Sequence, residues 1–327
     1  MKIYNNYFKI LIALILLIII SIFSLSYGDS QIGFFNSAKA LFGLGDKTSI
    51  IIVQNIRLPR VFAGILAGTT LALSGLLTRT ALKNPLADSS ILGIQSGASV
   101  FALFSILVIP KYTSLLPLFS FFGGLLAFIL VILFSYHRGF NPVRLVLSGV
   151  AVNSFFMAIT SIITITHVNE LRNSIQWSSG SLVGISMQEV STMFIYSLII
   201  IVLAYLTIPM LELLRLEDKM LISLGKNPNT YRCITCILAV MLASISLSFV
   251  GVIVFVGIII PHISQLLIGS NMKQTFIMTI ICGAILVVGV DLFSRIIFTV
   301  EMPVGALIGI LGAPLFLYLL RGAKNGI

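Results

Sequence analysis

The chain has 327 residues, of which 58% are hydrophobic and only 9% are charged, whereas roughly 25% of residues are charged in soluble domains. This composition excludes a soluble globular protein and predicts an all-α, polytopic membrane protein in contact with membrane lipid. The net charge of +10 does not indicate a nucleic-acid partner, because the basic residues lie in loops beside apolar segments and form no patch.

Ten apolar segments are candidates for membrane-spanning helices, each of which needs about 20 residues, or fewer where protein surrounds it. They cover residues 8–27, 59–80, 91–109, 115–135, 143–167, 190–211, 231–250, 254–269, 274–297 and 303–321. No Ala-x-Ala cleavage site follows the first segment, so we interpret it as a membrane helix and not as a signal peptide. Residues 1–327 are therefore expected to form a single transmembrane domain with about ten helices.

Lysine and arginine residues in the loops predict the orientation of this bundle, since cytoplasmic loops carry an excess of them. With the N-terminus inside, thirteen of the 20 basic residues lie on the cytoplasmic side and seven lie outside. Both termini are therefore predicted to be cytoplasmic, in agreement with an even number of spans.

Small residues recur along three of the predicted spans at the spacing of one helix face. They are Gly64, Gly68, Ala72 and Gly75 in the second span, Gly93 and Gly97 in the third, and Gly305 and Gly309 in the tenth. Such faces let two helix backbones approach closely, so we expect tightly packed helices.

The most charged stretch of the chain covers residues 211–232 and separates the sixth predicted span from the seventh. It holds seven of the 30 charged residues and is expected to form two short helices, broken at Gly225 and Pro228. The predicted orientation places it in the cytoplasm. An ordinary polar loop and a docking element for another protein are both compatible with this pattern.

No arrangement of residues typical of an enzyme is present. The phosphate loop GxxxxGK[ST], the HExxH motif and a serine elbow are all missing. Cys233 and Cys236 form a CxxC at the start of an apolar segment, where core packing is favoured over metal binding or redox chemistry. Asp291 and Arg295 are spaced to pair on one helix. We predict a protein that is not an enzyme and has no metal site and no cofactor.

Four groups of sequence strings are more specific than composition. They are RLPR at 57–60 with NPLAD at 84–88 and ILGIQSGA at 91–98; QWSSG at 176–180; FVGIIIPH at 255–262; and DLFSR at 291–295 with MPVG at 302–305 and GAPLF at 312–316. In this order and spacing, over essentially the whole chain, they resemble the permease subunits of ABC importers for iron–siderophores, haem and vitamin B12. The resemblance implies a bundle of ten helices in a bacterial cell membrane.

The resemblance also implies partners. They are ABC ATPase subunits that hydrolyse ATP, a second permease subunit that is identical or paralogous, and an external substrate-binding lipoprotein. The implied function is translocation of an iron(III)-siderophore, with haem or cobalamin as alternatives. An ion-coupled secondary transporter is the alternative from another class. It needs charged or polar coupling sites in the middle of the membrane, and the predicted spans are nearly free of them apart from Asp291.

In such permeases a cytoplasmic helix pair docks into a groove on the ATPase, and residues 212–230 correspond to it. The residues expected to take part are Glu217, Asp218, Ser223, Leu224, Gly225 and Lys226. Ser223-Leu224-Gly225 matches the core of the family motif. Glu217, Leu221 and Ile222 depart from it, since the family usually has glycine, alanine and often a basic residue at these positions.

The resemblance assigns roles to four further residues. It places Asn84 at the cytoplasmic gate, although Asn84-Pro85 is also an ordinary helix-ending turn. It makes Arg57, Arg60 and Arg295 the docking site for acidic residues of the binding protein. The alternative is that Arg295 only neutralises Asp291 and that the other two arginines only hold a helix end at the lipid headgroups.

Overall fold

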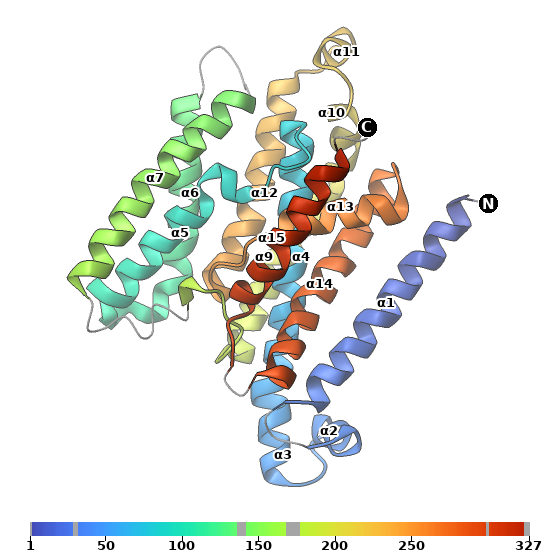
Figure 1. Ribbon diagram of the computed structural model, residues 1–327, viewed down its shortest axis with the longest axis vertical. Helices are drawn as coiled ribbons and strands as arrows, with labels where there is room; N and C mark the ends of the chain where they lie inside the picture. The colour runs from blue at the N-terminus through green and yellow to red at the C-terminus, as the bar shows by residue number, and fades with distance from the viewer. Residues whose placement is uncertain (1, 29–31, 136–141, 168–176, 299–300, 324–327) are drawn as a thin grey trace.

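The computed structural model describes residues 2–28, 32–135, 142–167, 177–298 and 301–323, and within these ranges the ordered elements are all helical (Figure 1). The α-helices are α1 (Lys2–Ser26), α2 (Phe34–Leu41), α3 (Lys47–Ile51), α4 (Leu58–Leu82), α5 (Ile94–Leu103), α6 (Leu116–Ser135), α7 (Pro142–Thr166), α9 (Met187–Leu206), α10 (Ile208–Leu214), α11 (Asp218–Ser223), α12 (Pro228–Val250), α13 (Val256–Ile268), α14 (Met272–Ile297) and α15 (Val304–Ala323). Short π or 3-10 turns are η1 (Ile52–Arg57), η2 (Ser89–Leu92), η3 (Phe104–Val108) and η4 (Pro110–Leu115). The predicted all-α class is confirmed.

Seven stretches of helix among the described residues are long and apolar enough to cross a membrane. Three shorter apolar helices, Ile94–Val108, Val256–Ile268 and Val304–Phe316, fall on the third, eighth and tenth predicted spans. The helices thus coincide with the ten predicted segments, whereas the count of ten membrane crossings stays a prediction.

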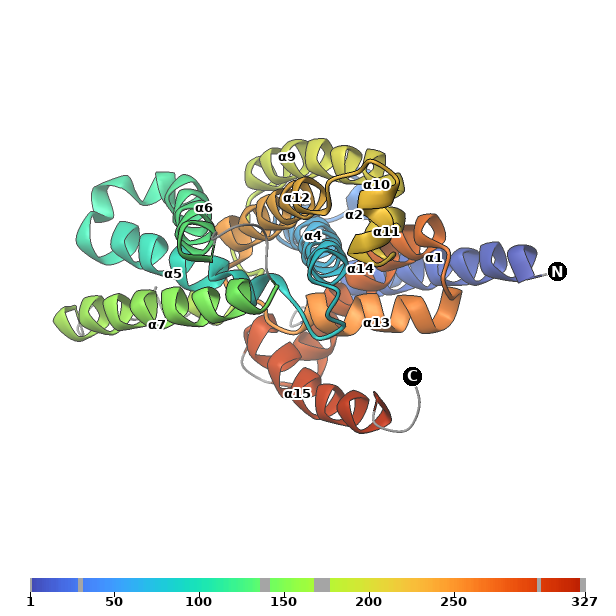
Figure 2. The same cartoon turned by 90° about the horizontal axis from the view of Figure 1, so that it is seen from above.

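Helix α4 lies in the middle of the bundle, with α9, α12, α13 and α14 around it (Figure 2). In the most apolar 18-residue stretch of the segment that contains α4, 89% of the residues are buried, whereas the corresponding share is 11% for α1 at the edge of the bundle. A Cβ atom on Gly68 would lie 2.1 Å from the carbonyl oxygen of Gly283 in α14, and one on Gly75 would lie 1.9 Å from that of Gly257 in α13. The small-residue face predicted on this span therefore makes contacts of backbone against backbone.

Helix α12 separates two hydrophobic clusters. Leu238, Ala239, Leu242 and Ile245 face the larger cluster, which also includes residues of α4, α9, α13 and α14. Cys236, Val240, Ala243 and Leu247 face the smaller cluster, which α5, α6 and α7 complete. In Figure 1 the α5–α6–α7 group stands to one side of the remaining helices.

The eighth predicted span is short because the chain is not helical over residues 251–255. Gly251 and Phe255 have positive φ values of 71° and 66°, and α13 begins only after them. Residues 177–181 run beside this segment: the Ser181 N–H donates to the Val250 carbonyl at 2.9 Å, and the Gly305 N–H donates to the Gly180 carbonyl at 3.0 Å. Gln176, the first residue of the predicted 176–180 string, lies outside the described residues.

With 13 residues, α13 is about 20 Å long, which is less than the thickness of a bilayer core.

The two ends of the bundle carry different features. Helices α2 and α3 lie at one end, and α11 lies at the other (Figure 1). The start of α1 and the end of α15 point toward the end that carries α11. We call the α11 end the coupling end and the α2–α3 end the opposite end.

Candidate functional site

The charged stretch forms two short helices, but the break between them differs from the prediction. Helix α9 ends at Leu206, Pro209 stands in the first turn of α10, and residues 215–217 separate α10 from α11. Gly225 and Pro228 instead separate α11 from α12. The predicted sixth span, 190–211, therefore includes a break at Thr207, because proline begins a new helix more readily than it continues one.

Gly225 ends α11 with a left-handed backbone, at φ 70°. The Lys226 N–H donates to the Leu221 carbonyl at 3.0 Å, and the Gly225 N–H donates to the Ile222 carbonyl at 2.9 Å. These two hydrogen bonds form a Schellman cap, which normally requires glycine at this position. No atom lies within 4 Å of the place where a Cβ of Gly225 would sit, so the backbone conformation and not lack of space selects glycine here.

Helix α11 exposes apolar side chains at its surface. Met220, Ile222 and Leu224 are 55%, 64% and 58% exposed, whereas Leu221 between them is fully buried. A six-residue helix held by one buried leucine has little intrinsic stability. An exposed apolar patch with a polar surround is typical of a surface that another protein covers.

Asp218, the first residue of α11, joins this helix to two others. Its carboxylate accepts a hydrogen bond from Lys83 Nζ at 2.8 Å and one from Arg232 Nη2 at 2.9 Å. Lys83 is the C-cap of α4, and Arg232 lies in α12, where its Nε also donates to the Ala81 carbonyl at 3.2 Å. We call Lys83, Asp218 and Arg232 the coupling triad.

The triad keeps Asp218 ionised. Partial burial opposes ionisation of this carboxyl, but the hydrogen bond from Lys83 and the charges of Arg232 and Lys83 outweigh it. As a result the pKa of Asp218 lies below its ordinary value of 3.8. Sequence analysis missed the roles of Lys83 and Arg232. Only their charge was visible, since 135 residues separate Lys83 from Asp218 and no local pattern connects them.

The remaining predicted coupling residues lie around the same helix. Glu217 is the N-cap residue of α11 without a side-chain cap, and the Ser223 hydroxyl donates to the Met220 carbonyl at 2.8 Å. Lys226 lines a shallow hollow of about 460 Å³ together with Asp218 and Gly225. The structure thus brings the six predicted residues into one surface element.

Asn84 follows Lys83 directly and forms a turn. Its side-chain oxygen accepts a hydrogen bond from the Leu86 N–H at 3.0 Å, as the alternative interpretation of Asn84-Pro85 requires. Asp88 closes the same loop: its carboxylate accepts a hydrogen bond from the Ser89 N–H at 2.6 Å and packs against Gly257 of α13. Burial raises the pKa of Asp88, and the hydrogen bonds from Ser89 and Ser90 oppose this shift. The loop after α4 is therefore tied to α11 at its start and to α13 at its end.

Arg57, Arg60 and Arg295 meet at the opposite end of the bundle, as expected for one site, but all three are buried. Arg60 Nε pairs with Asp291 at 2.9 Å and its Nη1 with Glu301 at 2.6 Å. The predicted pair of Arg295 with Asp291 is present at 3.0 Å.

Two of these arginines also hold the end of α1. Arg57 donates to the Leu25 carbonyl at 2.9 Å, and Arg295 donates to the carbonyls of Ser24 and Tyr27 at 3.0 and 3.2 Å. The last carbonyls of a helix lack partners within the helix and carry partial negative charge, so guanidinium groups stabilise them. The cluster is therefore structural, whatever else it binds.

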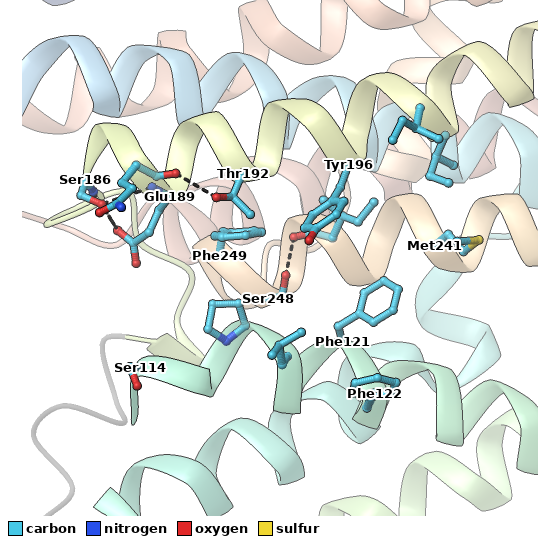
Figure 3. Close-up of a pocket in the computed structure, with 16 residues that line it drawn as sticks. Ser114, Phe121, Phe122, Ser186, Glu189, Thr192, Tyr196, Met241, Ser248 and Phe249 are labelled. Atoms are coloured by element: carbon cyan, nitrogen blue, oxygen red, sulfur yellow. Dashed lines mark hydrogen bonds between the residues drawn. The ribbon is translucent and has the colours of Figure 1, made fainter. Parts of the chain in front are cut away.

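A cavity of about 740 Å³ lies between α6, α9 and α12 (Figure 3). The rings of Phe121, Phe122, Tyr196 and Phe249 line it. Its one carboxylate, Glu189, accepts hydrogen bonds from the backbone and hydroxyl of Ser186 in a capping box that begins α9. Across the described residues, no group of three or more His, Cys, Asp or Glu side chains is placed to hold a metal ion.

The structure is an apolar helical bundle with helices long enough to cross a membrane and a short exposed helix, α11, at one end. The model of the FecCD transport family matches residues 16–322, and the chain belongs to that family. It is a permease subunit of the ABC importer class and not an enzyme.

The relatives include two iron-related permeases. The Fe(3+)-citrate import system permease protein YfmD of Bacillus subtilis is 35% identical over 317 residues, which cover 96% of this chain and 95% of YfmD. The probable heme-iron transport system permease protein IsdF of Staphylococcus aureus is 34% identical over 329 residues, or 99% of both chains.

Solved structures agree with this assignment. An inward-facing conformation of a putative metal-chelate type ABC transporter superposes with a TM-score of 0.85 at 26% identity, covering 96% of this chain and 99% of that one. PsaBC from Streptococcus pneumoniae, solved with a Fab, has a TM-score of 0.60 at 17% identity over 86% of this chain and 94% of its own. The second likeness shows the fold alone.

Proposed function

We propose that this chain is one of two permease subunits in an ATP-driven importer of a ferric chelate in a bacterial cell membrane. A separate ATPase hydrolyses ATP and binds α11 in the cytoplasm, and both chain termini lie on the same side. The observation that carries this proposal is the exposed apolar surface of α11, formed by Met220, Ile222 and Leu224. On a membrane permease, such a surface at the end of the bundle is typical of a site that another protein binds.

The coupling triad supplies a mechanism for this importer. Closure of the ATPase pair moves α11 as a rigid body, and Asp218 carries the movement to Lys83 at the end of α4. Asn84, the proposed gate residue, follows Lys83 without any intervening residue. Alternating access then arises from two discrete arrangements of packed helices, each favoured by one state of the ATPase.

The ATPase interface is testable by charge insertion. Ile222→Asp should abolish co-purification of the ATPase with the permease, because the carboxylate would be buried without a partner in the interface. Phe42→Asp is a matched control, since Phe42 is 84% exposed at the end of α2, remote from α11. Normal ATPase recovery with Ile222→Asp would exclude α11 as the docking element.

We propose an iron(III)-siderophore as the cargo, with haem supported equally by the relatives. YfmD and IsdF, at 35% and 34% identity, bear names that refer to ferric citrate and to haem iron. Growth of a deletion strain on single iron sources decides between siderophore and haem, and unchanged iron uptake with loss of cobalamin uptake would favour cobalamin. Uptake should also fail when ATP is depleted and survive loss of the proton gradient. The opposite result would favour an ion-coupled secondary transporter.

The arginine cluster is proposed to receive the substrate-binding lipoprotein. Arg57, Arg60 and Arg295 exceed Asp291 and Glu301 by one positive charge, so the cluster attracts an acidic surface. Because the three arginines are buried and Glu301 is the exposed charge of the cluster, the proposal requires an acidic residue of the binding protein to displace Glu301 from Arg60.

A further inference from the structure

A second polar cavity, of about 570 Å³, lies at the coupling end beside the triad. The last turns of α4, the ends of α10 and α13, and the start of α14 form its walls. Three of its residues are cations, Arg79, Lys83 and Arg215, and none of the residues that line it is a carboxylate. A cavity walled by three positive charges and no negative one favours an anionic ligand.

Arg79 is the least satisfied of these cations. Its Nη2 donates to Gln265 of α13, whereas its Nη1 is buried without a hydrogen-bond partner. The positive charge of Arg215 acts on it as well, and this repulsion adds to the cost of burial. Within the described part of the chain, neither Arg79 nor Arg215 forms an ion pair. Arg79 is partly buried, and a partly buried guanidinium without a counter-ion carries a desolvation cost that a bound anion would reduce.

The other two cations are already partly engaged. Lys83 pairs with Asp218 in the coupling triad, and Arg215 Nη1 donates to the Ser270 carbonyl at 2.6 Å. Both leave donor groups at the cavity, since an ammonium has three N–H donors and a guanidinium has five. Thr80 and Thr275 also line the cavity, and their hydroxyls donate to the carbonyls of Leu76 and Gly269.

We propose that this cavity binds the phosphate group of an anionic ligand and that the ligand is a membrane phospholipid. A guanidinium binds phosphate bidentately, which suits Arg79. The cavity lies at the depth where a headgroup is expected, within the last two turns of a spanning helix. Leu76, Leu214 and Met272 add an apolar wall against which the start of an acyl chain can pack. Basic pockets between membrane helices are a recurrent site for anionic headgroups.

The occupied site has a consequence for the gate. Asn84 and Pro85 also line the cavity, so a bound phosphate would touch the loop that the coupling triad holds. The ligand would therefore stabilise the arrangement of α4, α10 and α13 seen here relative to one in which Arg79 and Arg215 separate.

Native mass spectrometry of the purified permease in mild detergent tests the proposal. Phosphatidylglycerol should bind the wild type, and its affinity should fall at least about tenfold in Arg79→Gln and in Arg215→Gln. Lys219→Gln is the matched control, because Lys219 is an exposed cation of α11 outside the cavity. Arg215 is exposed, so its variant remains informative if Arg79→Gln fails to fold.

Two further probes identify the source of the phosphate. Phosphatidylcholine should bind more weakly than phosphatidylglycerol, and millimolar inorganic phosphate should not displace the lipid. If inorganic phosphate alone protects the wild type but not the two variants from thermal unfolding, the phosphate site stands and a soluble ligand occupies it. Equal binding of phosphatidylglycerol to the wild type and both variants, or equal binding of the two lipids, would overturn the proposal.

Discussion

Replacing Asp218 by asparagine should separate ATP hydrolysis from transport. The change removes one carboxylate that accepts hydrogen bonds from Lys83 and Arg232 at 2.8 and 2.9 Å. The pair with Lys83 is partly exposed and contributes at most about 1 kcal/mol. The pair with Arg232 contributes about 1–2 kcal/mol, because the arginine side chain is only 6% exposed and loses a charged partner.

Together these losses amount to about 2 kcal/mol, or about thirtyfold in the equilibrium between attached and detached states of α11. The assay is uptake by proteoliposomes that contain the permease and its ATPase, with ATP hydrolysis measured in parallel. We expect Asp218→Asn to keep the bound ATPase and most of the hydrolysis, while cargo transported per ATP falls about tenfold or more.

Two controls sharpen this experiment. Glu212→Gln removes an exposed negative charge of α10 that is not among the six predicted coupling residues and forms no ion pair within the described residues, and should leave transport unchanged. Asp218→Glu retains the charge and should restore most of the coupling. Wild-type transport by Asp218→Asn would refute the proposed link. Loss of ATPase binding in this variant would instead make Asp218 a docking residue.

Four further outcomes are expected. The pKa of Asp218 is lower in the folded protein than in the unfolded chain, so its carboxylate should stabilise the fold fully above the unfolded pKa, near pH 4. This stabilisation should disappear as the pH falls through the lower pKa of the folded protein, where the melting temperatures of the wild type and Asp218→Asn should converge. Gly225→Trp should lower uptake and ATPase co-purification about five- to thirtyfold, because the left-handed backbone costs a non-glycine residue about 1–2 kcal/mol, whereas Gly225→Asn should retain much of both. Gly283→Ala should lower the melting temperature, since its Cβ would lie 2.3 Å from the Gly68 carbonyl oxygen, while Gly289→Ala, with no atom within 4 Å, should not. Arg57→Glu combined with Arg60→Glu should weaken association of the binding protein, which should also weaken with salt. Because both arginines are buried and Arg60 pairs with Asp291 and Glu301, the melting temperature is measured in parallel; a lower melting temperature together with a wild-type association that does not depend on salt would show that the arginines are only structural.

The fold was predictable because its signals are local. Runs of about 20 apolar residues define spanning helices without knowledge of their neighbours, and the small-residue spacing of α4 marks its contact face. Proline and glycine positions also predicted a broken coupling segment. The predicted break at Gly225 and Pro228 is present, but it separates α11 from the long helix α12. The breaks at Thr207 and at residues 215–217 were not predicted.

The partners of the charged residues were not predictable from the same signals. Arg57 binds a carbonyl 32 residues away, and Arg60 binds a carboxylate 231 residues away. Side-chain spacing on one helix reveals pairs such as Asp291 with Arg295, whereas partners on different helices depend on how the bundle packs. For this reason residues expected at an exposed docking surface turned out to be buried.

The position of α12 between two hydrophobic clusters bears on where the subunit can deform. Glycine contacts bring the backbone of α4 directly against the backbones of α13 and α14, so we expect these three helices to move together as a rigid body. The α5–α6–α7 group meets α12 through the side chains of Cys236, Val240, Ala243 and Leu247, and helices that pack through side chains can slide past one another by small shear movements. A transport cycle is thus expected to move the α5–α6–α7 group along this face of α12. A larger side chain at position 243 would hinder that movement without altering either end of the bundle.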